Sequence, residues 1–460
     1  MNLPQAFCIR MENYLKEEYR AFMDSYHAPH TYALRLNLLK YPEGRPLKAF
    51  PFALRSVPWA EGGYYVSYED HPGKHPLHEA GAYYIQEPSA MSVVPLLSPA
   101  PGDIICDLCA APGGKSTQIA AGMQGRGLLV ANEIIPSRAR ILSENIERLG
   151  IPNAVITGEP PERMSDHFQT FFDKILIDAP CSGEGMFRKD ETAIREWSPA
   201  NVKTCAIRQK MILEHADRML KPGGVFVYST CTFSESENEE MILTFLEEHP
   251  NYTIENWQNF FPKSTGIISC KNLPEAMRLF PHKLEGEGHF AARLRKSEIT
   301  ESVEKRKKKK TTERKKPPVD YFDFSQKYLT GSDDSVLQAY LHTNANFQLF
   351  GNELYLVPAE MISLRGLKLL RAGLHLGTLK KNRFEPAHAL AKASAPHDFF
   401  QSFECSYETT LHFLRGETVS CPSDFKGWTP VCYEGLPLGF GKANNGTLKN
   451  HYPKGLRKKL

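Results

Sequence analysis

With 460 residues, the chain is too long for one ordinary hydrophobic core, and its length favours about three domains. Hydrophobic residues make up 41% of the sequence and charged residues 24%, which is typical of globular proteins, and a net charge of only +3 excludes a polycation whose whole surface is basic. No run of about 18 apolar residues occurs, so we expect no membrane contact, and ten scattered cysteines favour reduced thiols over a disulfide framework.

Residues 1–95 are predicted to form a mixed α+β domain that leads into the rest of the chain. Residues 1–20 carry acidic side chains early and lack the apolar core of a signal peptide, which favours a cytoplasmic protein. Short strand-like runs follow, such as YALRLNLLK at residues 32–40. In this run, basic residues alternate with apolar ones.

Residues 96–296 alternate apolar, strand-like runs with amphipathic helical patterns. The expected strands are IICDLC, GLLVANE, NAVITG, DKILIDA and GVFVYSTC. This alternation predicts an α/β domain with a doubly wound, mostly parallel sheet, whose ligands bind beyond the carboxyl ends of the strands. A further run, GHFAARL, is expected to add a late strand at the edge of this sheet.

A basic linker is predicted at residues 297–320, where VEKRKKKKTTERKKPP runs from Val303 to Pro318. Like charges at this density repel one another and leave no apolar face to bury, so we expect an exposed, flexible spacer that also attracts phosphates. Residues 321–460 contain many short strand-like runs punctuated by glycine, with basic and aromatic residues between them. They predict a β-rich region with a positive face.

The segment CDLCAAPGGKST, from Cys106 to Thr117, admits three interpretations. A phosphate-binding loop ending in Gly-Lys-Ser needs glycine at the position of Cys109, and Pro112 removes an amide donor. A zinc or redox site needs partners for Cys106 and Cys109, and no second close pair of Cys or His follows nearby, so we assign no metal site.

The third interpretation is a methyl-donor or nucleotide pocket. Gly113 and Gly114 let the backbone approach a ligand where a strand meets a helix, whose first amides are free to bind a carboxylate. The second strand ends at Asn132 and Glu133, and an acid at this place accepts hydrogen bonds from ribose hydroxyls. These features alone do not separate a nicotinamide cofactor from S-adenosylmethionine.

Two later strands end in cysteine-bearing loops. Asp178 and Cys181 follow the fourth strand in DAPCSGEG, and Cys231 follows the fifth in STCTFSESENE. Neighbouring parallel strands end beside the same crevice, so we expect two thiols and a carboxylate to face the ligand. Addition of a thiolate to carbon 6 of a pyrimidine makes carbon 5 an enamine nucleophile that attacks a sulfonium methyl group.

The motifs PGGK, DAPCSGEG and STCTFSxxENE together resemble the Nop/Sun family of RNA cytosine-C5 methyltransferases. HPLHEAGAYYIQEPSAM before the sheet and MRLFPHKLEGEGHFAARLRK after it are similar to that family's flanking segments. The tail beyond the linker resembles that of the bacterial RsmF-type 16S rRNA methyltransferases, PUA-like in its latter half. The resemblance implies a Rossmann-like class I methyltransferase domain with S-adenosylmethionine as cofactor.

The resemblance also implies roles for individual residues. Cys231 corresponds to the nucleophile that attacks carbon 6, and Cys181 to the thiol that assists proton removal and product release. Asp178 corresponds to a residue that contacts the cytosine and the methionine moiety of the cofactor. The residues expected to bind the cofactor are Cys109, Ala110, Ala111, Pro112, Gly113, Gly114, Lys115, Glu133, Arg138, Glu159 and Asp178.

Some of these assignments compete with plainer ones. The position of Arg138 fits an exposed helix surface as well as it fits a contact with the cofactor. Glu159 is the nearest acid to the expected adenine site, but Pro160 and Pro161 disturb its register. We assign Lys115 a local electrostatic role. His289, beside the final strand, is interpreted as structural or RNA-facing.

The predicted function is methylation of cytosine carbon 5 in 16S rRNA or the 30S subunit by a monomer with no protein partner. The enzyme needs an unpaired or extruded base, and basic and aromatic residues in the outer domains supply phosphate and base contacts. Two alternatives are a methyltransferase of tRNA cytosine and a catalytically silent RNA-binding assembly factor.

Overall fold

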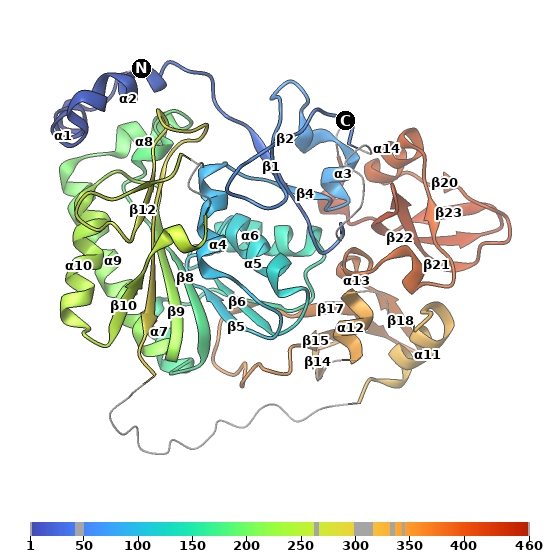
Figure 1. Ribbon diagram of the computed structural model, residues 1–460. Coiled ribbons are helices and arrows are strands. Elements are labelled where there is room, and N and C mark those ends of the chain that lie inside the picture. Colours follow the sequence, from blue (N-terminus) through green and yellow to red (C-terminus); the bar gives the residue numbers. More distant parts are fainter. Residues whose placement is uncertain are drawn as a thin grey trace.

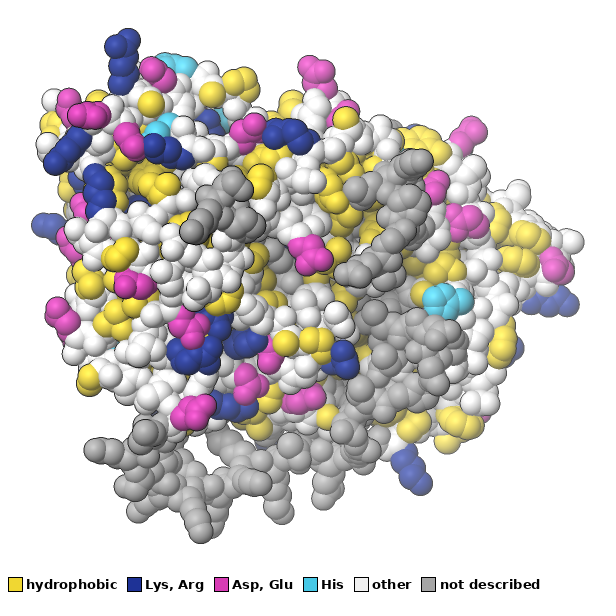
Figure 2. All heavy atoms as spheres, in the orientation of Figure 1, with side chains coloured by type: hydrophobic (Ala, Val, Ile, Leu, Met, Phe, Trp, Pro, Cys, Tyr) yellow, Lys and Arg dark blue, Asp and Glu magenta, His cyan; other side chains and the backbone are white. Residues whose placement is uncertain are grey.

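The computed structural model describes residues 2–41, 50–261, 266–298, 316–331, 336–342 and 346–458 (Figure 1). Most of the predicted linker at 297–320 therefore lies outside the described residues. Within these ranges, no helix combines the length and the apolar character needed to cross a bilayer. Figure 2 shows Lys and Arg side chains interspersed with Asp and Glu on the coloured part of one face, as the small net charge leads us to expect.

A ten-stranded sheet forms the centre of the molecule, with helices on both of its faces (Figure 1). Its parallel part is β5 (Ile104–Asp107), β6 (Leu128–Asn132), β7 (Ala154–Thr157), β8 (Phe172–Asp178) and β9 (Leu220–Thr230). The sheet order is β11-β12-β13-β9-β8-β5-β6-β7-β16, and β10 pairs with β13. The chain runs outward from β5 to β7 and then returns to β8 on the other side of β5, so the strand order reverses between β5 and β8.

The helices of this domain bury the apolar faces of the strands. They are α4 (Val93–Leu97), α5 (Gly114–Met123), α6 (Pro136–Arg148), α7 (Pro161–His167), α9 (Pro199–Met219) and α10 (Glu239–Glu248). The short helix α8 (Glu191–Glu196) has no fully buried residue and packs beside the N-terminal helices. The parallel strands are apolar on both faces because helices cover both. Because these strands are apolar throughout, the five apolar runs in the sequence could be recognised as buried strands.

The last strand of the domain lies inside the sheet and not at its edge. The prediction that GHFAARL forms an edge strand was therefore wrong. β13 (His289–Lys296) pairs antiparallel with β9 on one side and with β12 (Met277–Leu279) and β10 (Tyr252–Glu255) on the other. A further short strand, β11 (Ile268–Ser269), pairs with β12. Strands of two to four residues carry too little periodicity to be recognised, and they cover the edge that the sequence seemed to leave open.

The N-terminal residues form a helical pair and a small sheet of order β2-β3-β1-β4. Their elements are α1 (Gln5–Leu15), α2 (Tyr19–Ser25), β1 (Ala33–Leu36), β2 (Arg55–Ser56), β3 (Gly63–Tyr65), α3 (Pro76–Glu79) and β4 (Tyr83–Ile85). Phe7 and Phe22 of the helical pair share a buried cluster with Phe187 and Phe233. The helices therefore pack on the loops that follow β8 and β9.

The C-terminal residues contain two further sheets, of order β14-β15-β17-β18 and β19-β21-β22-β23-β20. The first group is α11 (Val319–Tyr328), α12 (Val336–His342), β14 (Asn346–Phe350), β15 (Glu353–Val357), β17 (Leu374–Lys380), β18 (Arg383–Pro386) and α13 (His388–Ala393). The second is β19 (Phe403–Glu404), α14 (Tyr407–Arg415), β20 (Val419–Ser420), β21 (Gly427–Tyr433), β22 (Leu436–Asn444) and β23 (Thr447–Asn450). The expected fold class, an α/β domain with an α+β domain before it and a β-rich region after it, is confirmed.

One C-terminal strand belongs to the central sheet. β16 (Leu369–Ala372) pairs antiparallel with β7, and the Gly158 amide donates to the Lys368 carbonyl at 2.9 Å. Arg371 also forms an ion pair with Glu147 of α6 at 2.9 Å. An open strand edge invites pairing with other chains, and here the tail covers it.

Candidate active site

The loops after β8 and β9 bring two thiols together. Cys181 and Cys231 lie with their Sγ atoms 3.4 Å apart, and both side chains are partly exposed. The hydrogen bond with the Cys231 thiol, together with burial, raises the pKa of Cys181 well above its usual value. Two negative charges at this distance would repel strongly, so the arrangement favours a state in which at most one of the two sulfur atoms is ionised.

Glycines allow the cysteine loops to pack this closely. The Gly185 amide donates to the Cys231 carbonyl at 2.7 Å, and a Cβ atom on Gly185 would lie only 2.8 Å from that oxygen. Gly183 has a φ of +72°, in the left-handed region that glycine adopts without strain. Gly185 is thus required by the approach of the two loops, and Gly183 by the backbone conformation of the turn before it.

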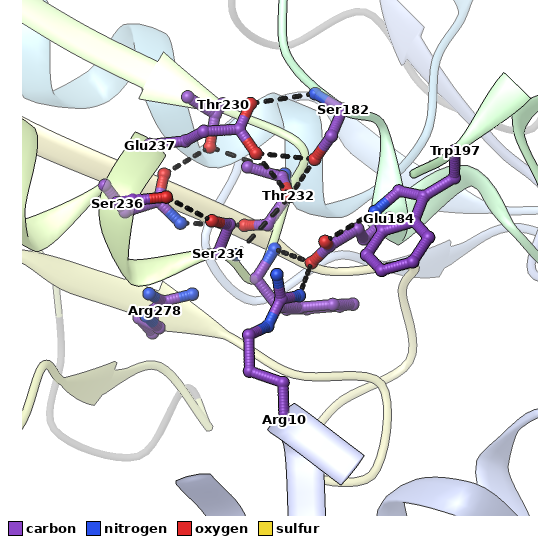
Figure 3. Close-up of polar contacts among 12 residues, drawn as sticks. Arg10, Ser182, Glu184, Trp197, Thr230, Thr232, Ser234, Ser236, Glu237 and Arg278 are labelled. Carbon is purple, nitrogen blue, oxygen red and sulfur yellow. Dashed lines mark hydrogen bonds and ion pairs between the residues drawn. The ribbon is translucent and has the colours of Figure 1, made fainter. Parts of the chain in front are cut away.

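A buried hydrogen-bond network joins the residues that follow the two cysteines (Figure 3). The Glu237 carboxylate accepts hydrogen bonds from the Ser182 amide at 2.9 Å and from the Ser182 hydroxyl at 2.6 Å. The Ser182 hydroxyl lies 2.8 Å from that of Thr232. Since Ser182 follows Cys181 and Thr232 follows Cys231, one buried carboxylate holds both loops.

Glu237 is further fixed by the surrounding helix and strand. Gln209 of α9 donates to its carboxylate at 3.1 Å, and the Tyr228 hydroxyl donates to its backbone carbonyl at 2.6 Å. Burial raises the pKa of Glu237 above its usual value. Glu237 was not among the predicted site residues, although its place in STCTFSESENE, six residues after Cys231, was the available signal.

A second buried carboxylate connects the Cys181 loop to the N-terminal helices (Figure 3). Glu184 accepts a hydrogen bond from the Trp197 indole at 2.8 Å and from the Phe233 amide at 3.1 Å. Arg10 of α1 forms an ion pair with it at 2.5 Å. The first helix of the chain therefore contacts the loop that carries Cys181.

We expect substitution of Glu237 by alanine to loosen both cysteine loops. The lost acceptor leaves buried Ser182 and Gln209 donors unsatisfied, which should lower the free energy of unfolding by about 1–3 kcal/mol. Displacement of the thiols should slow single-turnover methylation by on the order of 10²-fold. Thermal unfolding and rapid-quench assays measure the two effects.

Two further variants sharpen this comparison. Glu237→Gln keeps one acceptor oxygen and should lose less in both assays. Ser236→Ala is the matched control, since the Ser236 hydroxyl meets only that of Ser234, at 2.9 Å, among the described contacts. A wild-type methylation rate in Glu237→Ala would contradict the positioning role.

Asp178, at the carboxyl end of β8, is held as a carboxylate. Lys115 of α5 forms an ion pair with it at 2.7 Å, and the Ser229 hydroxyl donates to it at 2.8 Å. Burial alone would raise the pKa of Asp178, but the Lys115 ammonium and the nearby His289 outweigh it and hold the pKa well below its usual range. Lys115 thus has the local electrostatic contact predicted for it.

His289 was interpreted as structural or RNA-facing, and the structure places it in the crevice. Its Nε2 atom lies 3.7 Å from the Asp178 carboxylate, and the ring is buried. Among the described residues neither ring nitrogen has a hydrogen-bond partner. A buried imidazole that makes no hydrogen bond, although it lies near a carboxylate, marks a place where a polar ligand would complete the contacts.

Asp107 was also missed, although it ends β5 directly before the glycine loop. Ser116 donates to one of its carboxyl oxygens at 2.6 Å, and within the described chain the other oxygen has no partner. Burial raises the pKa of Asp107 to about 7, and the Ser116 hydrogen bond offsets only part of this effect.

The loop predicted to bind the cofactor comprises Cys109, Ala110, Ala111, Pro112, Gly113, Gly114 and Lys115. It links β5 to α5, and Gly113 has a φ of +113°, where a side chain would also approach Leu142 at 3.2 Å. α5 begins at Gly114 without a side-chain cap, so its first amides remain available to a ligand. This loop fits a ligand with a carboxylate, as the methionine end of S-adenosylmethionine has.

Glu133 and Arg138 lie beside this loop. The Glu133 carboxylate accepts a hydrogen bond from the Ile135 amide at 2.9 Å and lies 3.5 Å from Arg138. Arg138 also donates to the Ala111 carbonyl at 2.9 Å. Arg138 therefore contacts both parts of the predicted cofactor site, and Glu133 sits at the end of β6 where ribose hydroxyls would be bound.

Glu159 is buried at the end of β7 and is already engaged by the C-terminal tail. Its carboxylate accepts a hydrogen bond from the Lys368 amide at 2.6 Å. A contact with adenine remains a prediction for this residue. The strand-forming tail could not be foreseen from the ITGEPPERM sequence around Glu159.

The N-terminal domain also touches the predicted cofactor loop. Arg35 of β1 is buried and donates to Gln86 at 3.0 Å, to the Gly114 carbonyl at 3.1 Å and to Thr117 at 2.8 Å. Its three contacts tie the small sheet to the first turn of α5. Across the described ranges, no group of three or more His, Cys, Asp or Glu side chains converges as a metal site would require.

Family models match almost the whole chain. The model described as 16S rRNA methyltransferase RsmB/F matches residues 94–295, and that for the N-terminal domain of 16S rRNA methyltransferase RsmF matches 3–88. The first C-terminal domain of RsmF rRNA methyltransferase matches 331–393, and the methyltransferase RsmF PUA domain matches 400–458.

Curated relatives agree with these matches over nearly their full length. Ribosomal RNA small subunit methyltransferase F of Erwinia tasmaniensis is 31% identical over 468 residues, covering 98% of this chain and 96% of the relative. The protein of the same description from Vibrio vulnificus is 33% identical over 416 residues, covering 88% and 86%.

Solved structures resemble a little over 60% of the chain. A methyltransferase homologue from Pyrococcus horikoshii is 30% identical, with a TM-score of 0.52 over 61% of this chain and 91% of that chain. NSun6 from Pyrococcus horikoshii with SFG, at 24% identity, shares the fold, with a TM-score of 0.56 over 64% and 98%.

Proposed function

Because the chain belongs to the RsmF family of 16S rRNA methyltransferases, we propose that it methylates carbon 5 of cytosine in 16S rRNA through a covalent adduct of Cys231. It is an S-adenosylmethionine-dependent enzyme of methyltransferase fold. The observation that carries the proposal is the 3.4 Å separation of two thiols at the carboxyl ends of β8 and β9, where β8 borders the switch point of the sheet.

The paired thiols suit a two-stage reaction at a pyrimidine. In the first stage, the Cys231 sulfur bonds to carbon 6 of the cytosine, and the electron pair of the carbon 5–carbon 6 double bond makes carbon 5 nucleophilic. When bound, S-adenosylmethionine supplies an electrophilic methyl group on its sulfonium. In the second stage, the proton on carbon 5 passes to Cys181, the double bond re-forms and the Cys231 sulfur leaves.

The contact between the thiols gives an order to these stages. While Cys231 carries the negative charge, Cys181 donates a hydrogen bond to it and stays protonated, in line with its raised pKa. Once the Cys231 sulfur is bonded to carbon 6, it no longer carries that charge. The charge that opposed ionisation of Cys181 is then gone, so this thiol can release its proton to solvent and, as a thiolate, accept the proton from carbon 5.

The charged residues around the thiols orient the reactants in this proposal. The Lys115 ammonium keeps Asp178 ionised, and this carboxylate would accept a hydrogen bond from the cytosine amino group. Residues 109–115 and Glu133 would hold the methionine and ribose ends of the cofactor, with Arg138 bracing both. Glu159 would act on the adenine side, at the junction with the tail.

We assign the outer regions to RNA binding. Residues 1–95 and 321–460 would hold the rRNA, 96–296 would carry out the chemistry, and 297–320 would join the two halves. We propose a cytoplasmic monomer that acts on 16S rRNA or on the 30S subunit. A PUA domain match at residues 400–458 supports an RNA contact by the tail.

Bisulfite sequencing of total RNA from a strain lacking the gene tests this function. We expect one or more 16S rRNA cytosines to lose protection from conversion and to regain it when the wild-type gene is restored. Nucleoside mass spectrometry then identifies 5-methylcytidine as the missing product. Loss of the modification from tRNA alone, or of a methyl group on nitrogen, would contradict the proposal.

A further inference from the structure

Two adjoining hollows open beside the cysteine loops, with volumes of about 400 and 360 Å³. Both are lined by the segment His30–Tyr32, which leads from the N-terminal helices into β1. Lys189 lines the first hollow, and Arg188 and Gly286 line the second. Each volume falls within the range of roughly 300–1,000 Å³ that is typical of ligand pockets.

The walls of these hollows are continuous with the thiol site. Arg188 and Lys189 end the loop that begins at Cys181, and Arg188 binds Glu287 at 2.6 Å and the Gly286 carbonyl at 3.0 Å. The backbone oxygens of Glu287 and of Cys231 both lie within 3.4 Å of the ideal Cβ position of Gly185. A strand of RNA with its target base at Cys231 would therefore pass beside these hollows.

Tyr32, which lines both hollows and is partly buried, packs against an exposed aromatic ring, that of Tyr68. The Tyr32 and Tyr68 rings lie 4.7 Å apart at an interplanar angle of 33°, and Tyr68 is 60% exposed. His71 meets Tyr68 edge-on at 5.6 Å. A large ring held in place by a second ring, with most of its own surface in water, is a surface on which a nucleic-acid base stacks at little entropic cost.

The charges nearby favour stacking over phosphate binding. Arg55 in the second hollow is paired with Glu285, and Lys189 in the first lies 3.9 Å from Glu287. Glu69 and Asp70, which follow Tyr68 directly, are exposed. With its cations paired and two acids beside the rings, this surface offers little net attraction to a phosphate.

We propose that Tyr68, backed by Tyr32, stacks on an unpaired base adjoining the target cytosine of the substrate RNA. The inference rests on the proposed function, since it takes the target base to lie at Cys231. It assigns Tyr68 to substrate positioning, with no part in the chemistry at the thiols.

The test uses the full-length protein and a short single-stranded oligonucleotide that carries the target cytosine. Tyr68→Ala should weaken binding about tenfold or more by fluorescence anisotropy, and Tyr68→Phe should bind as the wild type does. The dependence of log Kd on log salt should keep its slope, because no phosphate contact is lost. The rate at saturating RNA should be unchanged.

A matched control and an abasic series locate the contact. Ile207→Ala removes another exposed hydrophobic side chain, on α9 of the central domain, and should leave binding of the short oligonucleotide unchanged. In the abasic series, each oligonucleotide lacks the base at one position beside the target cytosine. The wild-type protein should bind more weakly to only one of them, the one that lacks the base stacked on Tyr68. At that position, Tyr68→Ala should cause no further loss.

Two results would overturn the stacking site. One is wild-type affinity in Tyr68→Ala, and the other is a loss accompanied by a smaller salt slope, which would indicate a phosphate contact. Failure of the proposed function has a different signature. In that case methylation at cytosine carbon 5 would be absent from the wild type, while Tyr68→Ala would still lose affinity for the oligonucleotide.

Discussion

Replacement of Cys231 by alanine is expected to abolish methylation while binding of RNA and of S-adenosylmethionine persists. Without a sulfur atom at this position, carbon 5 of cytosine stays too weak a nucleophile to take the methyl group. The single-turnover rate should fall by at least about 10⁴-fold, the scale on which loss of an essential nucleophile registers. Transfer of a labelled methyl group to RNA measures it.

The structure indicates that this variant should fold. The contact that Cys231 makes with Gly185 uses its backbone carbonyl, which alanine retains, and the network behind it starts at the neighbouring Thr232. Cys421→Ala is the matched control, since Cys421 is also a partly exposed free thiol but lies in the C-terminal tail. Methylation at the wild-type rate by Cys231→Ala would refute the covalent mechanism.

The parallel core and its strand tips were predictable from the sequence because their signals are local. Strands β5, β6, β7, β8 and β9 are apolar on both faces, and each ends in a loop rich in Gly, Pro or Ser. Parallel strands bring their carboxyl ends to one edge. The meeting of the Cys181 and Cys231 loops follows from this topology, although the 3.4 Å separation of the thiols required coordinates.

Long-range contacts were not predictable, because neither partner shows a pattern of its own. β16 is four residues long, yet it joins β7, from which it is separated by some two hundred residues. Arg35 looked like one basic residue in a strand, but it is buried against the first turn of α5. A polar residue that will be buried by a distant segment has the same local sequence as one exposed to water.

These contacts join the outer domains to the candidate active site. Arg10 of the first helix pairs with Glu184 in the Cys181 loop, and Arg35 holds the start of α5. On the other side, the tail supplies the Lys368 amide to Glu159. Segments assigned to RNA binding thus contact the thiol loop and the predicted cofactor site directly, so RNA docking and the geometry of the site are physically connected.

Replacement of Cys181 by alanine should have the opposite signature to loss of Cys231. Attack on carbon 6 and methyl transfer do not need Cys181, but elimination does, because the proton on carbon 5 has lost its acceptor. The covalent protein–RNA adduct should therefore accumulate and appear as a shifted band on a denaturing gel. A carbon–sulfur bond survives reducing agents, so the band should persist with and without them.

Three comparisons make the Cys181 result decisive. The double variant Cys181→Ala/Cys231→Ala should give no shifted band, because the sulfur that forms the bond is gone. Cys181→Ala without S-adenosylmethionine should give less adduct, since addition to carbon 6 reverses freely until carbon 5 is methylated. If Cys181→Ala releases product at the wild-type rate and no band shifts, then the thiol 3.4 Å from Cys231 is not the base, and another group must take the carbon 5 proton.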